Sequence, residues 1–257
     1  MDKKIKPKII GWSEEVTKNL SKYSKQVTIS IDTVEPRLLS KSDINILLHF
    51  EPSVIRESNR SIIEKSSYYD LILTWDKSIL NACKNSILFP FGDCWIDGSD
   101  RKIHNKTKNI SIIASTKNQT EGHRLRHSVI KEIPMDTYGR RYNPIDNKIT
   151  ALKDYRFTVV IENIKQDYWF TEKLIDAFMT GTIPLYWGFD SIDEFFDPNG
   201  IIKFNTTEEL TKMLPTLTEE LYLNKLEHIK NNFKLSFKYS SIWVRLDKEI
   251  KKFLNNE

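Results

Sequence analysis

At 257 residues, the chain is long enough to bury the core of one large domain or of two compact halves. Its hydrophobic content of 39% and charged content of 29% are ordinary for a globular protein, and 39 Lys and Arg against 35 Asp and Glu leave a formal charge of only +4. This small excess is not gathered into a basic arm. It therefore argues against a nucleic-acid partner and suits a local anionic ligand such as a diphosphate.

The chain shows no sign of export or of membrane insertion. Its two cysteines, Cys83 and Cys94, lack the number of a disulfide framework and the spacing of a zinc site, which predicts two ordinary thiols. The charged N-terminus has no apolar segment behind it, and no window approaches about 18 apolar residues. We therefore expect neither a signal peptide nor a membrane span, and a cytoplasmic location in a bacterium or in a cell infected by a large virus.

In the first half of the chain, short apolar runs alternate with helical patterns. The apolar face of residues 44–50 is nearly continuous, as is typical of a strand covered on both sides in a parallel sheet. Together with the alternation of strand and helix patterns on either side of it, this run indicates an α/β layered domain. We expect strands over residues 8–12, 27–31, 44–50, 70–75 and 87–89, and helices over residues 14–23 and 53–65.

A polar, aperiodic stretch over residues 97–108 is predicted to link this block to a second alternation. The pattern as a whole predicts two Rossmann-like domains with a cleft between them, over residues 1–104 and 105–234, followed by a C-terminal helix over 235–257. The Lys-rich amphipathic pattern of residues 218–251 favours packing or domain bridging, with peripheral membrane contact as the alternative. In the second half we expect strands over residues 109–114, 157–161, 182–187 and 201–204, and helices over residues 122–132 and 174–180.

The densest chemical signal follows the apolar strand 157–161. Glu162 and Asn163 end this strand at the carboxyl edge of the sheet, where ligands bind in open α/β folds. Lys173 falls in the first turn of the next helix, where the helix dipole disfavours a cation unless an anion docks at the free N–H groups. A nucleotide diphosphate would pair with the Lys173 cation and accept hydrogen bonds from these N–H groups. The alternative is that Lys173 is a solvated surface residue and Glu172 only a helix-start preference.

Residues 155–204 closely resemble the donor-binding domain of the family 10 glycosyltransferases, the α-1,3/1,4-fucosyltransferases. The hallmarks of that family are an F-x(4)-E-N stretch, an aromatic-x-T-E-K stretch, and G-T-x-P-x-Y-W-G followed by F-x-P. The resemblance implies a GT-B type fold, made of two Rossmann-like domains. The four motifs stand here at residues 157–163, 169–173, 181–188 and 196–198.

The resemblance also implies a function and a set of donor contacts. It implies inverting transfer of fucose from GDP-fucose to a hydroxyl of an acceptor glycan, with fixed cations holding the diphosphate and polar groups holding the nucleotide and sugar hydroxyls. At Trp169 the family usually has tyrosine, which leaves the donor class more secure than the donor sugar. The implied donor-site residues are Arg126, Asn163, Trp169, Glu172 and Lys173, with Arg124 and Tyr168 as second choices.

Residues 48–52 are similar to the point at which the family places its general base. Glu51 follows an apolar strand, and a partly buried carboxylate there is able to take a proton from a hydroxyl. One alternative is that Glu51 only caps a helix that starts near Ser53. The other alternative is His49 as the base.

Several common catalytic motifs are missing from the sequence. It contains no D-x-D motif, so no ligand set for a metal-bridged diphosphate is evident. Together with the resemblance, this absence predicts transfer that requires no cofactor and no metal. It also lacks the glycine-rich phosphate loops and the commonest hydrolase motifs. Three rival interpretations remain: transfer from another GDP-sugar, a non-catalytic protein that binds a sugar nucleotide or a glycan, and a glycosidase, for which no carboxylate pair is evident.

Overall fold

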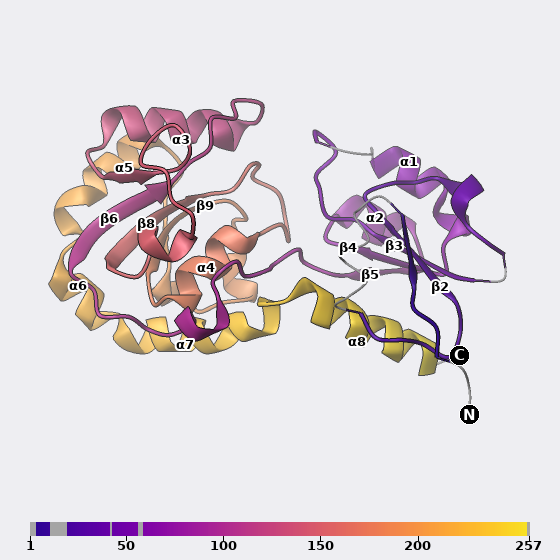
Figure 1. Ribbon diagram of the computed structural model, residues 1–257. Coiled ribbons are helices and arrows are strands. Elements are labelled where there is room, and N and C mark those ends of the chain that lie inside the picture. Colours follow the sequence, from indigo (N-terminus) through magenta and orange to yellow (C-terminus); the bar gives the residue numbers. More distant parts are fainter. Residues whose placement is uncertain (1–3, 11–19, 42, 56–58, 256–257) are drawn as a thin grey trace. The chain divides into compact units, whose positions relative to one another are not determined.

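The computed structural model describes residues 4–10, 20–41, 43–55 and 59–255 of the chain. These residues fold into two compact units (Figure 1). The first unit combines Met1–Phe91 with Ile242–Glu257, and the second is Gly92–Ser241. Each unit has its own sheet and its own hydrophobic core.

The sheet of the first unit is entirely parallel, and its strands follow one another in chain order. In the central strand, Leu47 is paired with Ser30 of the neighbouring strand on one side and with Ile72 of the neighbouring strand on the other. All five of its strands begin within one residue of the expected positions. The strands are β1 (Lys8–Ile10), β2 (Val27–Ile31), β3 (Ile44–Leu48), β4 (Leu71–Thr74) and β5 (Ser86–Leu88).

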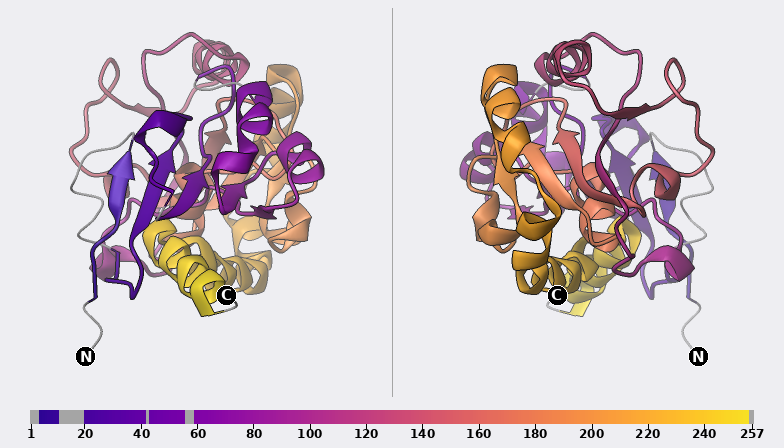
Figure 2. Two further views of the ribbon diagram at one scale, coloured as in Figure 1. Left: turned by 90° about the vertical axis from the view of Figure 1, so that its right-hand side faces the viewer. Right: turned by 90° about the vertical axis from the view of Figure 1, so that its left-hand side faces the viewer.

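Apolar side chains alternate between the two faces of this sheet, as the two-residue period of a strand requires. Leu47 packs with Ile62 and Ile79 on the face covered by two short helices, whereas Ile46 packs with Leu246 of the C-terminal helix on the other face. Figure 2 shows this last helix along the first sheet. The helices are α1 (Asn59–Glu64), α2 (Lys77–Ala82) and α8 (Ile242–Asn255), with single turns η2 (Pro36–Leu38) and η3 (Ser66–Tyr68).

The sheet of the second unit is also parallel, but its strands are not in chain order. The order is β10-β9-β8-β6-β7, so the chain runs from β6 to the edge strand β7 and then returns to β8 on the other side of β6. This reversal creates a topological switch point between β6 and β8. The strands are β6 (Lys108–Ile113), β7 (Asp136–Tyr138), β8 (Tyr155–Ile161), β9 (Ile183–Trp187) and β10 (Ile202–Lys203).

Helices cover both faces of the second sheet (Figure 1). Val160 packs with Phe178 of α4 on one face, and Ile161 packs with Val129 of α3 and Leu210 of α5 on the other. The helices are α3 (Glu121–Glu132), α4 (Glu172–Met179), α5 (Thr207–Met213), α6 (Glu219–Asn224) and α7 (Leu226–Ser236). The single turns are η4 (Gly98–Asp100), η5 (Lys148–Ala151), η6 (Ile192–Glu194), η7 (Pro198–Gly200), η8 (Leu214–Thr216) and η9 (Phe237–Tyr239).

The division of the chain differs from the expected boundaries at residues 104 and 234. The second unit already begins at Gly92, because Ile96 lies in its core and the Trp95 N–H donates to Asp176 Oδ1 at 2.7 Å. It ends at Ser241, after which α8 packs on the first sheet through Ile242, Leu246 and Ile250. The polar stretch that was expected to be a linker is therefore part of the second unit.

Two expectations about elements of the first unit fail, and one strand of the second was missed. Residues 20–23 are not helical, and Tyr23 instead forms an antiparallel bridge with Ile5; the rest of the helix expected over 14–23 lies largely outside the described residues. The helix expected over 53–65 is confirmed only as α1. The edge strand β7 was missed because its three residues carry no apolar alternation.

Candidate functional site

The carboxyl ends of β6 and β8 meet at the switch point of the second sheet, where ligands bind in open α/β folds. The loop after β6 leads to the start of α3, and the loop after β8 leads to the start of α4. Two helix N-termini, each the positive end of a helix dipole, therefore converge on this edge. Most of the predicted donor-site residues lie here.

Glu162 fixes the start of α4. Its side chain is fully buried at the end of β8 and accepts two hydrogen bonds from Thr171, one from the N–H at 2.8 Å and one from Oγ1 at 2.7 Å. Thr171 is in turn the N-cap of α4, so the strand end and the helix start form one rigid joint. A buried carboxylate held in this way also needs a cation nearby.

Lys173 supplies that cation. Its Nζ lies 3.0 Å from Thr171 Oγ1, 3.5 Å from Glu162 Oε2 and 3.4 Å from Glu172 Oε1. About a quarter of its side chain, 27%, remains exposed. The two carboxylates therefore hold a partly accessible ammonium group in the first turn of α4, where an anion would also meet the free N–H groups.

The start of α3 is pressed directly against the end of β8. The Gly122 N–H donates to Asn163 O at 3.0 Å, and a Cβ atom at Gly122 would lie only 1.7 Å from Glu162 O. Only glycine permits this close approach. One turn further on, buried Arg126 donates from Nε to Ile161 O at 2.9 Å and from Nη2 to Asn163 Oδ1 at 2.8 Å.

The structure thus gives the two candidate arginines different environments. Arg126 is buried and braces the end of β8, and within the described residues its Nη1 has no protein partner. Arg124 is exposed, and its Nη1 donates only to Gln119 O at 3.4 Å. Of the two, Arg126 lies with Asn163 at the switch point, as the preferred assignment expected.

The local potential of this edge is positive. Burial, and then the nearby cations Arg126, Lys117 and Lys173, lower the pKa of His123 to about 4. His123 is therefore neutral near pH 7, and its Nδ1 lies 2.9 Å from Oγ1 of Thr120, the N-cap of α3. Three cations near one buried imidazole favour an anionic ligand at this edge.

On the other side of α4, Glu172 belongs to a buried charge network. Burial opposes its ionisation, but Lys173 and Lys148 outweigh burial and lower the pKa of Glu172 to about 2. Lys148 Nζ lies 3.3 Å from Glu172 Oε1 and 2.8 Å from Asp176 Oδ2. Lys148 was not predicted as a site residue, since the polar stretch around it gives no motif.

The two aromatic candidates are packed into the second unit. Trp169 is only 2% exposed, which leaves little of its indole for a ligand. Tyr168 has a left-handed backbone with φ of 59°, and its ring packs edge-on against Phe189 and Phe195. A left-handed conformation is uncommon outside glycine and marks a constrained loop between β8 and α4.

A hollow of about 420 Å³ opens beside α3. It is on the same edge of the sheet, because Thr116 and Asn118 of its lining belong to the loop that leaves β6. His127 Nδ1 lies 3.1 Å from the Tyr142 hydroxyl, and both residues line the hollow. Its polar lining, completed by Arg141, adjoins the cationic start of α3.

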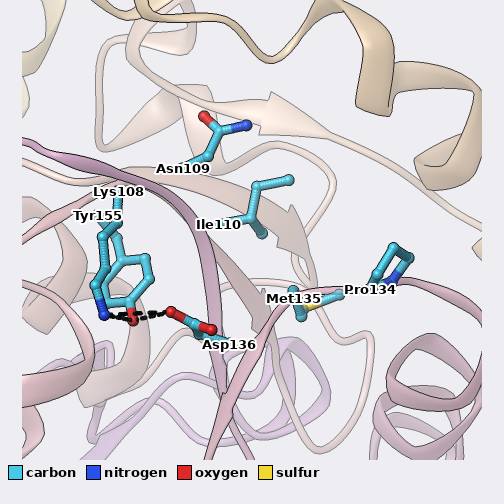
Figure 3. Close-up of a pocket in the computed structure, with 7 residues that line it drawn as sticks. All are labelled: Lys108, Asn109, Ile110, Pro134, Met135, Asp136 and Tyr155. Atoms are coloured by element: carbon cyan, nitrogen blue, oxygen red, sulfur yellow. Dashed lines mark hydrogen bonds and ion pairs between the residues drawn. The ribbon is translucent and has the colours of Figure 1, made fainter.

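A second hollow, of about 520 Å³, lies at the opposite edge of the same sheet (Figure 3). Tyr155 donates to Asp136 Oδ2 at 2.5 Å, and Lys108 Nζ lies 3.1 Å from the Tyr155 hydroxyl. These groups stand at the amino ends of β6, β7 and β8. The hollow is therefore remote from the switch point and is not part of the candidate site.

Glu51, the predicted base, belongs to the first unit. It follows β3 and is half-buried, and its N–H donates to Asp32 Oδ1 at 3.1 Å. Asp32 ends β2 in a left-handed conformation with φ of 48° and also accepts the Phe50 N–H at 2.6 Å. Asp32 thus fixes the backbone of Glu51, a role that no sequence motif signals.

His49, the alternative base, is buried. Burial lowers its pKa to about 4, and its Nδ1 lies 2.9 Å from Thr74 Oγ1 while its ring stacks on Trp75. A neutral, enclosed imidazole is poorly placed to take a proton from a hydroxyl in solution. Glu51 is the more accessible of the two groups.

In the described part of the chain, the cysteines and the other possible metal ligands do not gather into a site. Cys83 and Cys94 are free and buried, and burial raises the pKa of Cys94 to about 12. Among the described residues, no group of three or more His, Cys, Asp or Glu side chains is arranged to hold a metal ion. No helix in the described part of the chain is long and apolar enough to cross a membrane.

Comparison with known proteins decides the family. Residues 103–242 match the family model described as glycosyltransferase family 10 (fucosyltransferase), C-terminal part. The chain belongs to glycosyltransferase family 10. The matched region contains the whole switch-point site, from the start of α3 to the start of α4.

Individual relatives of this family 10 chain match over shorter stretches. An α-(1,3)-fucosyltransferase, FucT, of Helicobacter pylori is 39% identical over 61 residues, which are 24% of this chain and 13% of the relative. An α-(1,4)-fucosyltransferase of Arabidopsis thaliana is 31% identical over 78 residues, 29% of this chain and 20% of the relative. The matches therefore span well under two thirds of these relatives.

A solved structure supports the fold over nearly the whole chain. The crystal structure of an α1,3-fucosyltransferase with GDP matches with a TM-score of 0.61 and 17% identity, over 95% of this chain and 94% of its own. At this identity the likeness concerns the fold alone. The two parallel α/β units are of the GT-B type, as expected.

Proposed function

We propose that the chain transfers fucose from GDP-fucose to a hydroxyl of an acceptor glycan, with inversion at the anomeric carbon. The observation that carries the proposal is the joint at the start of α4, where Glu162 and Glu172 hold the partly accessible ammonium of Lys173. This joint lies within the matched family region, and the relatives that match are named as fucosyltransferases.

In this proposal the diphosphate lies across the starts of α3 and α4. Lys173 and the helix N–H groups meet the phosphate oxygens and stabilise the charge that develops as GDP departs. Arg126 braces Ile161 and Asn163 through Nε and Nη2, which leaves its Nη1 available to the same anion. The hollow lined by His127 and Arg141, next to the start of α3, is available for the nucleoside.

The reaction forms one bond and breaks one. The acceptor oxygen attacks C1 of fucose, the bond from C1 to the β-phosphate oxygen breaks, and GDP leaves with the electron pair. The Glu51 carboxylate takes the proton of the acceptor hydroxyl. The backbone hydrogen bond from Glu51 to Asp32 fixes the position from which Glu51 acts.

The closest rival is transfer of another sugar from a GDP-linked donor. Trp169 stands where the family usually has tyrosine, and its buried indole carries no phenol to meet the donor. The other rival is a non-catalytic protein that binds a sugar nucleotide or a glycan. It predicts GDP binding without any product.

The test combines binding and turnover. Calorimetry with GDP and GDP-fucose should show binding to the wild type, and binding at least tenfold weaker to Lys173→Ala. Lys230→Ala, which removes an exposed lysine paired with Glu227 on α7, serves as the matched control and should bind normally. Absence of GDP binding to the wild type overturns the proposal.

Turnover then separates the rivals. Incubation of GDP-fucose and other GDP-sugars with a panel of acceptor glycans should give product with fucose alone, and Glu51→Gln should abolish it without changing GDP affinity. Product from a different GDP-sugar only would identify the first rival. Tight binding without product from any donor would identify the second.

A further inference from the structure

Lys148 occupies a position that neither its local sequence nor a surface role explains. It starts the turn η5, between β7 and β8, yet only 19% of its side chain is exposed. Its ammonium group lies between two carboxylates of α4, at 3.3 Å from Glu172 Oε1 and 2.8 Å from Asp176 Oδ2. Since Glu172 and Asp176 are four residues apart, one cation bridges successive turns of the helix.

Trp95 closes the remaining side of the ammonium group. The Lys148 Nζ lies 4.0 Å from the centroid of the indole ring, in a cation–π contact. The Trp95 N–H also donates to Asp176 Oδ1 at 2.7 Å. Three segments that are distant in sequence, the loop after β5, the turn η5 and helix α4, therefore converge on one lysine.

The network leaves Glu172 charged and oriented. One ammonium faces two buried carboxylates, and burial together with Glu172 raises the pKa of Asp176, although Lys148 opposes this. Glu172 thus keeps the negative charge. Both Lys148 and Lys173 contact Oε1 of Glu172, and within the described residues no cation contacts its Oε2.

We propose that Lys148, held by Trp95 and Asp176, is a positioning residue that orients the Glu172 carboxylate toward the hydroxyls of the donor sugar. This inference rests on the proposed function, because it assigns Glu172 to the sugar rather than to the nucleotide. An ionised carboxylate oxygen accepts strong hydrogen bonds from hydroxyls, and its direction is fixed only if its other oxygen is held.

The proposal separates two affinities that a merely structural ion pair would change together. GDP lacks the sugar, so Lys148→Met should leave GDP affinity within about twofold of the wild type. The affinity for GDP-fucose should fall about tenfold or more, as for loss of one hydrogen bond to a charged group. Lys148→Arg, which restores a cation, should recover most of that loss.

Two further variants keep the test decisive. Trp95→Ala removes an indole that is 58% exposed and should fold, while it frees Lys148 and weakens GDP-fucose binding in the same direction. In a Glu172→Gln background, Lys148→Met should have no additional effect on GDP-fucose affinity, because both changes act through one carboxylate. The Trp95→Ala comparison stands even if Lys148→Met is too unstable to purify.

A pH series supplies an independent readout. In the wild type, the affinity for GDP-fucose should not depend on the charge of Glu172 down to about pH 4, because its pKa lies at about 2. Without Lys148 that pKa rises, so GDP-fucose affinity, but not GDP affinity, should fall as the pH drops from 6 to 4. Equal loss of GDP and GDP-fucose affinity in folded Lys148 and Trp95 variants, or no loss of either, overturns the inference. Failure of the wild type to bind GDP-fucose would overturn the proposed function itself.

Discussion

Replacement of Gly122 by alanine should disrupt the packing of the start of α3 against the end of β8. The new Cβ would lie 1.7 Å from Glu162 O, whereas ordinary contact begins at 3.4 Å. The obstacle is a backbone carbonyl in a central strand, which cannot rotate away as a side chain can. The helix start must therefore withdraw by about 1.7 Å, the difference between these two distances.

Hydrogen bonds to three acceptor atoms are lost in that movement. Asn163 O loses the Gly122 N–H at 3.0 Å, Ile161 O loses Nε and Nη2 of Arg126 at 2.9 and 2.5 Å, which we count as one bond, and Asn163 Oδ1 loses Arg126 Nη2 at 2.8 Å. One neutral bond and two bonds to a charged group contribute about 4 kcal/mol together. The higher helix propensity of alanine returns at most about 1 kcal/mol, so the net loss of unfolding free energy is about 3 kcal/mol.

The assay is urea denaturation followed by tryptophan fluorescence, with GDP affinity measured by calorimetry on the same preparations. Gly98→Ala is the matched control, because no atom lies within 4 Å of a Cβ at that position. Gly122→Ala should unfold at a lower urea concentration and bind GDP at least tenfold more weakly, whereas the control should behave as the wild type. Wild-type stability and GDP affinity in Gly122→Ala would refute the close approach of α3 and β8.

Three more predictions concern buried polar groups. His49 has a folded-state pKa of about 4, so between that pH and about 6.5 the unfolded chain binds the extra proton and the free energy of unfolding falls as the pH drops. His49→Gln should remove about 2 kcal/mol of the loss between pH 7 and pH 5, seen as a smaller fall in Tm over that range. An unchanged fall in Tm would contradict this. Glu162 accepts two hydrogen bonds from Thr171, and in Glu162→Gln the amide NH2 would face one of these donors. The substitution should lower the free energy of unfolding in urea by about 2–4 kcal/mol and weaken GDP binding. A loss below about 1 kcal/mol would show that the joint is not rigid. Lys106 Nζ lies within hydrogen-bond distance of three backbone carbonyls and of Thr182 Oγ1. Lys106→Met should therefore lower the free energy of unfolding by about 3 kcal/mol or more in the same assay, whereas Lys230→Met, at an exposed lysine, should change it very little.

The sequence predicted the parts of the fold that depend on local apolar patterns. The strands β2, β3, β8 and β9 were placed correctly because their continuous apolar runs reflect burial on both faces of a parallel sheet. The edge strand β7 was missed, since an exposed edge needs no such pattern. The unit boundary was misplaced because residues 97–108 are polar by composition, while their membership of the second unit depends on contacts such as that between Trp95 and Asp176.

The candidate site shows the same division between local and distant information. Asn163, Glu172 and Lys173 were nominated together because they stand within one continuous motif, and the structure places them near Arg126; their role in donor binding stays a prediction. Lys148 is separated from Glu172 by 23 intervening residues, which include the whole of β8. Such a partner is visible only in the fold, because its spacing from the motif follows from loop length and not from helix or strand periodicity.

The charges at the start of α4 alternate along a single row: Glu162, Lys173, Glu172, Lys148 and Asp176. Successive members are 3.5, 3.4, 3.3 and 2.8 Å apart. Each lysine is shared by two carboxylates, so neither ammonium is satisfied by a single partner and neither is free to swing into solvent.

A row that ends in carboxylates at both sides would repel an anion. The nearby guanidinium of Arg126 and the two helix dipoles make the edge positive. In the proposed function, the diphosphate would compete with Glu162 and Glu172 for Lys173, so GDP should depart more easily than from an unshared lysine. The carboxylates thus set the strength of the anion site as well as its geometry, and neutralising either of them should tighten GDP binding unless, as at Glu162, the same group also builds the joint.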